Sequence, residues 1–395
     1  MEKTSALKFW SPSYYFVFFV ASASLGPFLV LYYEKRGLSG SQIGLVTSIS
    51  PLIGLVAASF WSAIADATRR HKLIFVVASA GAVTSALLIY GATSLALLIP
   101  AVMLFAFLSA PVMPLMDSST MVLLEGRKDQ YGKTRVWGTF GWAVGAPVAG
   151  WLVERSGLQW SFYLYALMMA IGLLISLRIP IGHAHISVPF WNGIRGLFSN
   201  RKWMFFLLII FLAGIGGSSV NSYLFLYLES LGASKTLMGV ALTISTVSEV
   251  PMMFFAARLL RRFKPRGLIL IALAIYVIRL LLYSVVGVPW VILVIQLLHG
   301  LTIPTLWVAG VSYVAEIAPP GLGATAQAVF AGVLNGLGGA AGALMGGILY
   351  QNVGPVLLFR IVALILLAAL LLLAVAGGAG PQPDPPANTP APATP

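Results

Sequence analysis

The sequence consists mainly of long apolar runs separated by short polar segments. A helix needs roughly 20 apolar residues to cross a hydrocarbon core about 30 Å thick, and each run approaches that length. Continuous runs predict helices, because membrane-spanning strands would be shorter and would alternate in polarity. The predicted helices lie near residues 11–33, 42–64, 73–91, 95–122, 135–154, 159–179, 203–228, 236–258, 267–286, 288–314, 323–349 and 355–377. The sequence therefore predicts an all-α membrane protein with twelve transmembrane helices.

Composition excludes a soluble protein. Hydrophobic residues make up 59% of the chain and charged residues only 9%, and the mean hydropathy is +0.94. A net charge of +13 would suit nucleic acid, but most Lys and Arg residues fall in short clusters between the apolar runs, such as residues 69–72 and 261–264. This is the positive-inside pattern. It predicts a multi-pass protein of the cell membrane, in contact with lipid and not with nucleic acid, with both termini in the cytoplasm.

The longest polar interruption divides the helices six and six. We expect two pseudo-symmetric six-helix bundles, residues 1–180 and 203–378, joined by a cytoplasmic linker at 181–202. The stretch from Phe190 to Arg195 predicts a short amphipathic helix on the inner membrane surface. The Pro- and Ala-rich residues 379–395 predict a disordered tail.

The cysteine content and the first residues of the chain bear on disulfides and on a cleaved leader. The chain has no cysteine, which excludes disulfides and thiolate metal sites. Its first residues, Met-Glu-Lys, precede an apolar run without a cleavage motif, so we expect the first helix to be retained.

Glycine is concentrated in the predicted helices five and eleven. Small residues let helix backbones approach closely in lipid and slide past one another. Packing alone would account for any single glycine, but the set favours bundles that rock. The residues are Gly138, Gly141, Gly145 and Gly150 with Pro147 in helix five, and Gly336, Gly338, Gly339, Gly342, Gly346 and Gly347 in helix eleven.

Five ionisable residues lie inside the apolar runs or at their ends: Asp117, Arg135, Glu249, Arg279 and His299. Burying a charge in hydrocarbon costs several kcal/mol unless it is paired or lines a wet cavity. Asp117 and Arg135 lie near helix ends, so they would either extend to the interface or pair across neighbouring helices. Glu249 and Arg279 have no short path to water, and His299 would either exchange protons or bond a polar neighbour.

The inner end of the second predicted helix carries a basic turn, and a similar turn follows helix eight half a chain later. The first turn resembles the loop signature of the major facilitator superfamily, with Asp66 in the acidic position, Arg70 in the basic one and Arg69 in place of a glycine. The resemblance implies a conformational gate in which Asp66 braces one helix end against its neighbour. Ordinary positive-inside charge is the alternative.

Two further segments resemble the branch of this superfamily that contains lactose permease and other proton-linked sugar, nucleoside and phenylpropionate importers. The runs 114–117 and 131–142 resemble the segment in which a carboxylate, an arginine and a tryptophan hold the sugar. The resemblance implies that Asp117, Arg135 and Trp142 form the N-terminal half of a substrate site.

In the C-terminal half, Arg279 and the run 297–304 resemble the arginine and histidine of the proton and sugar machinery, and Glu249 matches its helix-eight glutamate. Thr302 stands where the pattern has a carboxylate after the histidine. Uncharged residues replace the paired acids and lysine of helices seven, ten and eleven. They are Asn221, Gln296 and Asn335.

We therefore assign proton coupling to Glu249 with Arg279 and His299, and we add His299, Asn221 and Asn335 to the predicted substrate-binding residues.

These observations predict a secondary active transporter, a proton-coupled symporter that imports a small polar solute by alternating access. A sugar-like solute fits best, and aromatic acids or nucleosides are the alternative substrates. A proton-drug efflux antiporter and a non-transporting membrane receptor or assembly factor are the other classes left open. The sequence carries no metal-ligand cluster, phosphate-binding loop or nucleophile-base motif, so we expect no enzyme activity and no cofactor. We expect a monomer.

Overall fold

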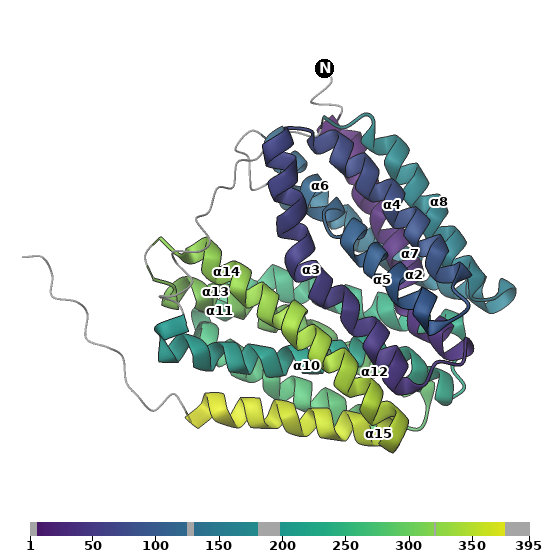
Figure 1. Ribbon diagram of the computed structural model, residues 1–395. Coiled ribbons are helices and arrows are strands. Elements are labelled where there is room, and N and C mark those ends of the chain that lie inside the picture. The colour runs from purple at the N-terminus through teal and green to yellow at the C-terminus, as the bar shows by residue number, and fades with distance from the viewer. Residues whose placement is uncertain (1–5, 125–129, 181–197, 320, 376–395) are drawn as a thin grey trace, which may run out of the picture.

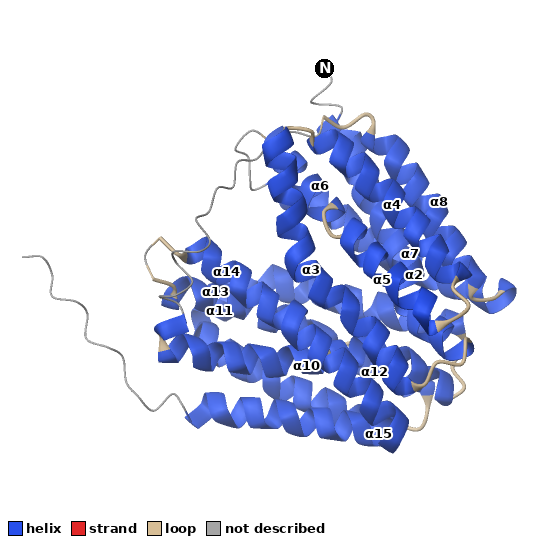
Figure 2. Cartoon of the chain, in the orientation of Figure 1, coloured by secondary structure: helices blue, strands red, loops and turns tan. Residues whose placement is uncertain are grey.

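The computed structural model describes residues 6–124, 130–180, 198–319 and 321–375, which form helices and short connecting turns (Figures 1 and 2). Among these residues, ten helical stretches are long and apolar enough to cross a membrane. The predicted amphipathic helix at 190–195 and the predicted tail at 379–395 lie outside the described residues.

Within each half of the chain, short connections join successive helices. In the N-terminal half they are α2 (Ser11–Lys35), α3 (Gly40–Thr68), α4 (His71–Gly91), α5 (Leu95–Ser109), α6 (Val112–Leu123), α7 (Tyr131–Ser156) and α8 (Gln159–Ser176), and the short π-turn η1 (Ala6–Trp10) precedes α2. In the C-terminal half they are α10 (Arg201–Ser230), α11 (Lys235–Val285), α12 (Pro289–Gln296), the 3₁₀ turn η3 (His299–Leu301), α13 (Ile303–Ile317), α14 (Gly323–Ala331), the π-turn η4 (Gly332–Leu337) and α15 (Gly338–Val375).

Two of the apolar stretches are about twice as long as a membrane requires. The α11 helix has 51 residues, which would measure about 75 Å if straight. It contains Lys264 at a φ of 56° before Pro265, and α15 contains Gly354 at a φ of 77° before Pro355. A left-handed residue followed by proline ends one helix and starts another. Dividing both stretches at these residues brings ten candidate spans to the twelve that the sequence predicts.

The predicted helix at 288–314 is interrupted, although the hydrophobic pattern is continuous. It forms α12, η3 and α13, and the interruption falls at His299–Thr302. Pro304 provides the reason, because its ring clashes with the carbonyl of residue 300 and it has no N–H to donate. The Gly300 carbonyl instead accepts the Thr305 hydroxyl at 2.9 Å, and the Gly300 N–H donates to Ser248 Oγ at 2.9 Å.

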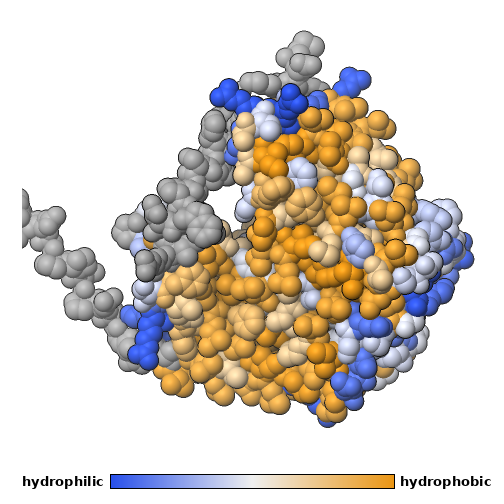
Figure 3. Space-filling view, viewed as in Figure 1, coloured by the Kyte–Doolittle hydropathy of each residue, from blue (hydrophilic) through white to orange (hydrophobic). Residues whose placement is uncertain are grey.

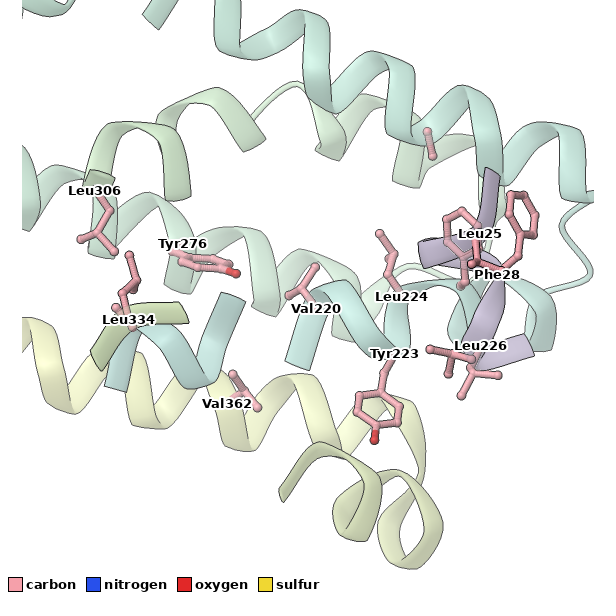
Figure 4. Close-up of a cluster of buried hydrophobic side chains, with 14 of the residues drawn as sticks. Leu25, Phe28, Val220, Tyr223, Leu224, Leu226, Tyr276, Leu306, Leu334 and Val362 are labelled. Carbon is pink, nitrogen blue, oxygen red and sulfur yellow. The ribbon is translucent and has the colours of Figure 1, made fainter. Parts of the chain in front are cut away.

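Two bundles meet at one end of the molecule and diverge toward the other (Figure 1). We call the meeting place the closed end and define it by residues 39–44, 150–154, 234–239 and 343–351, which contact one another across the bundles. Apolar packing continues through it. Phe28 of α2 lies 5.2 Å, between ring centroids, from Phe225 of α10, within the buried cluster shown in Figure 4.

An internal repeat underlies this closed end. The stretch 28–44 can be aligned without gaps with 223–239, and both stretches end one helix, turn and begin the next. Gly37 and Gly232 both have a positive φ, 81° and 77°. The shared residues are Leu29/Leu224, Leu31/Leu226, Tyr32/Tyr227, Glu34/Glu229, Gly37/Gly232, Ser39/Ser234 and Gly44/Gly239. This repeat supports the predicted pseudo-symmetry, while the predicted bundle boundaries stay predictions.

The outer surface suits lipid. Large apolar side chains such as Phe254, Val285 and Trp290 are exposed, and Figure 3 shows a broad apolar face with hydrophilic residues gathered at its edges. An apolar exterior of this extent is expected where hydrocarbon replaces water as the solvent.

The packing of α10 on η4 gives a test of the fold. We expect Gly214→Ala to lower the free energy of unfolding by about 1–3 kcal/mol, because the added methyl group would collide with the Leu334 carbonyl. Thermal unfolding of the detergent-purified protein measures the change. Gly54→Ala is the control, since no atom lies within 4 Å of the added carbon. Equal melting temperatures for the two variants would contradict this close approach.

Candidate functional site

The N-terminal half brings Asp117 of α6 and Arg135 of α7 together. Arg135 Nε lies 4.0 Å from Asp117 Oδ1, and the two side chains are 33% and 35% exposed. The Tyr15 hydroxyl of α2 donates to the same carboxylate oxygen at 2.7 Å. A carboxylate and a guanidinium at this separation attract each other without a direct short hydrogen bond. Their polar atoms therefore face partly open space.

An aromatic wall continues from this pair. The Arg135 guanidinium lies 4.3 Å from the centroid of the Phe19 ring, and Trp142 packs edge-on against Phe19 at 6.3 Å. Arg135 and Trp142 are seven residues apart on α7, which places them on one face of the helix. The predicted trio of carboxylate, arginine and tryptophan is thus one continuous surface.

In the C-terminal half, Arg279 of α11 is only 2% exposed. Its guanidinium donates to protein acceptors on three sides. They are Tyr283 Oη at 3.0 Å, His299 Nδ1 at 3.0 Å, Thr302 Oγ1 at 3.3 Å and Gln296 Oε1. A buried guanidinium is tolerated when its rigid set of donors is satisfied in this way.

His299 lies between Arg279 and Glu249. Its Nε2 is 3.2 Å from Glu249 Oε1, with the two side chains 23% and 28% exposed. Arginine donates and never accepts, so His299 Nδ1 must accept from Arg279, and the ring proton must sit on Nε2 and point at Glu249. This geometry holds His299 neutral. Glu249 and Arg279, which the sequence predicts to act together, are connected through His299.

The helix break positions this histidine. Ser248, next to Glu249 on α11, accepts the Gly300 N–H, and Thr302 Oγ1 donates to the His299 carbonyl at 2.7 Å. Broken helices near the middle of a membrane are typical of transporter binding sites, because they free backbone and side-chain groups to face a cavity.

A cavity of about 70 Å³ adjoins the C-terminal cluster. Arg279, Gln296, His299 and Asn221 contribute to its lining, and Pro27 of α2 contributes from the opposite bundle. Asn335 is exposed on η4 and is not part of this lining as the described residues define it. The structure thus places Asn221 beside the site and Asn335 elsewhere in the C-terminal bundle.

The predicted gate residues lie at the C-terminal end of α3. Asp66 Oδ1 is 3.0 Å from Nε2 of His71, the first residue of α4. Arg69 has a left-handed backbone, with a φ of 55°, and ends α3, and Arg70 is exposed. Asp66 therefore connects α3 to α4 through His71, which was not among the predicted gate residues.

Sequence reasoning missed several partners of the site. Tyr15, Tyr283 and Ser248 were not among the predicted residues. Tyr15 bonds Asp117 and Tyr283 bonds Arg279, while Ser248 holds the backbone of Gly300, next to His299. Tyr283 had a usable signal, since it lies four residues after Arg279 on the same helix face. Gln296 and Thr302 were noted only as departures from the lactose permease pattern, and both accept from Arg279.

We expect Arg279→Lys to lower the free energy of unfolding by about 2–3 kcal/mol. An ammonium on a flexible stem cannot satisfy four acceptors that a planar guanidinium reaches together. Thermal unfolding in detergent checks this. Arg36→Lys serves as the control, because Arg36 is exposed while it bonds Tyr32 and Tyr90. Equal losses of unfolding free energy in the two variants would contradict the prediction that all four acceptors need the Arg279 guanidinium.

Comparison with known proteins agrees with this architecture. The MFS_1 like family matches residues 9–361. The chain is 29% identical to the maltose permease of Geobacillus stearothermophilus over 92% of this chain and 93% of that one. It is 26% identical to the probable 3-phenylpropionic acid transporter of Escherichia coli (strain K12), over 92% and 96%. Its fold resembles the crystal structure of the nucleoside transporter NupG, with a TM-score of 0.82 at 19% identity over 93% of this chain and 98% of that one. The chain belongs to the MFS_1 like family of the major facilitator superfamily, and it is a membrane transporter, not an enzyme.

Proposed function

We propose that this transporter is a proton-coupled symporter that imports a small, neutral, polar solute, with a sugar as the first choice. The main support for the proposal is that the N-terminal bundle has a partly exposed ion pair, whereas the C-terminal bundle has a buried arginine. Asp117 and Arg135 lie together and partly exposed in one bundle, whereas Arg279 is enclosed by protein acceptors in the other. The likeness to a maltose permease over nearly the whole chain supports the sugar assignment.

The N-terminal surface suits hydroxyl groups and the face of a sugar ring. Asp117 accepts hydrogen bonds, Arg135 donates them, and the 4.0 Å between them leaves room for a hydroxyl to bond both. Trp142, next to Phe19, offers an aromatic surface on which apolar C–H groups pack. A neutral solute leaves the opposite charges of this pair balanced.

The C-terminal cluster argues against an anionic substrate there. Tyr283, Gln296, His299 and Thr302 already accept from Arg279. A substrate carboxylate would have to displace these acceptors and leave their polar groups unpaired in the membrane. This favours a neutral solute over an aromatic acid.

Glu249 is the group that we assign to proton loading. It accepts the His299 Nε2–H, and its side chain is more exposed than Arg279. Protonating Glu249 weakens its bond to His299 and leaves the Arg279 charge without a carboxylate nearby. The proton and the solute then drive transport by favouring the same conformational change, since equal binding to both states would shift nothing.

Orientation completes the proposal. With both termini in the cytoplasm of the cell membrane, α2 and α10 run outward and the closed end faces outside. The structure then corresponds to the inward-facing state of an alternating-access cycle.

The substrate half has a direct test. We expect Asp117→Asn and Trp142→Ala each to weaken sugar binding by about tenfold, because each removes one strong contact to the solute. Uptake of labelled disaccharides, nucleosides and phenylpropionate into proteoliposomes identifies the solute, and its KM measures the loss. Trp137→Ala, an exposed tryptophan of the same helix, is the control. Parent-like KM values in both site variants would place the solute elsewhere.

The coupling half is tested separately. We expect Glu249→Gln to retain substrate exchange across the membrane but to lose substrate-induced proton uptake, because the amide cannot load a proton. A pH indicator records proton uptake and labelled counterflow records exchange. Glu316→Gln removes a carboxylate from an exposed site on α13 and should behave as the parent. Unchanged proton uptake in Glu249→Gln would remove Glu249 from the coupling mechanism.

A further inference from the structure

The closed end contains two equivalent crossings of the bundles. Gly150 of α7 packs against the backbone at Lys235, the first residue of α11, and Gly347 of α15 packs against the backbone at Gly40, the first residue of α3. In each case a Cβ on the packing glycine would collide with a carbonyl oxygen of the opposite bundle. A second close approach lies one turn earlier on α7 and α15. There a Cβ on Gly239 would meet the Ala146 carbonyl, and a Cβ on Gly44 would meet the Ala343 carbonyl.

One helical turn after each packing glycine lies a side chain that reaches across. Glu154 Oε2 accepts the Thr236 N–H at 3.1 Å and also the Thr236 hydroxyl. Gln351 Oε1 accepts the Ser41 N–H at 2.9 Å. Thr236 and Ser41 occupy the same position, the second residue of a helix, in the two copies of the internal repeat.

These bonds add to the capping of both helices. The helix's own bundle supplies the N-cap serine, with Ser39 Oγ accepting the Gln42 N–H and Ser234 Oγ accepting the Leu237 N–H. The opposite bundle supplies the acceptor for the preceding N–H. The first turn of a helix leaves N–H groups without helical partners. The caps from the opposite bundle therefore stabilise the two helices only while the bundles are in contact.

We propose that Glu154 and Gln351 are paired positioning residues of the transport cycle, which hold the closed end together by capping a helix of the opposite bundle. Opening this end breaks both caps. The pair is unequal, because a carboxylate is favoured by the positive end of a helix dipole and an amide is not. Glu154 also holds the Thr236 hydroxyl, so its cap is the stronger of the two.

The chain has no cysteine, which makes the test specific. Spin labels are attached at Lys35→Cys and Ser230→Cys, which are equivalent exposed positions at the ends of α2 and α10. Pulsed electron paramagnetic resonance then measures the distance between the two labels across the closed end. The full chain is measured in proteoliposomes without substrate, so the result is independent of the proposed symport.

We expect Glu154→Ala and Gln351→Ala each to raise the population with a long closed-end distance, by about two- to fivefold, and the double variant to raise it further. Glu154→Gln keeps an acceptor and should fall between Glu154→Ala and the parent. Ser94→Ala is the matched control, because Ser94 caps α5 from within its own bundle and its loss should leave the distance unchanged.

Parent-like distances in a folded double variant would overturn the proposal. An equal shift in Ser94→Ala would also overturn it, because the effect would then reflect general loosening. If the double variant does not purify as folded protein, the two single variants decide by the same criteria.

Discussion

A guanidinium buried among membrane-spanning helices constrains much of the C-terminal bundle. Arg279 is only 2% exposed, and hydrocarbon offers no water to replace a missing acceptor. The protein meets this requirement with side chains from α11, α12 and the broken segment that follows α12. Pro304 breaks the helix, and the break places His299 and Thr302 where both accept from Arg279. The same contact holds His299 neutral, with its Nε2–H directed at Glu249.

The cluster around Arg279 includes residues of the helix that begins at the closed end. Glu249 and Ser248 lie on the first part of α11, while Arg279 lies beyond the Lys264 break, and His299 lies on the interrupted helix between α12 and α13. The first part of α11 also begins at the closed end, where Glu154 of the opposite bundle caps it. In the transport cycle that we propose, proton loading at Glu249 and opening of the closed end therefore act on the same part of α11.

Hydrophobic run length was sufficient to predict the helices, since each span must cover the same hydrocarbon thickness. It was insufficient for the interruption at His299–Thr302, because run length does not locate a break within a span. The local signals there are Gly300 and Pro304. Asp117, Arg135 and Trp142 could be grouped from their resemblance to known permeases. Tyr15 could not, since it comes from a helix a hundred residues away in the chain. The repeat that includes Ser39 and Ser234 was present in the sequence, but the predicted repeat comprised only the basic turns after the second and eighth helices.

The sequence by itself determined that this protein spans a membrane as helices, that its chain is built from two related halves, and which few charges lie within them. These properties depend on composition, run length and repetition, which can be read along the chain without knowing which residues are in contact. Only the tertiary structure decided that His299 separates Arg279 from Glu249 and that Glu154 and Gln351 cap helices of the opposite bundle. Such contacts join residues far apart in the chain, and packing geometry selects them from many polar pairs that the sequence leaves equally available.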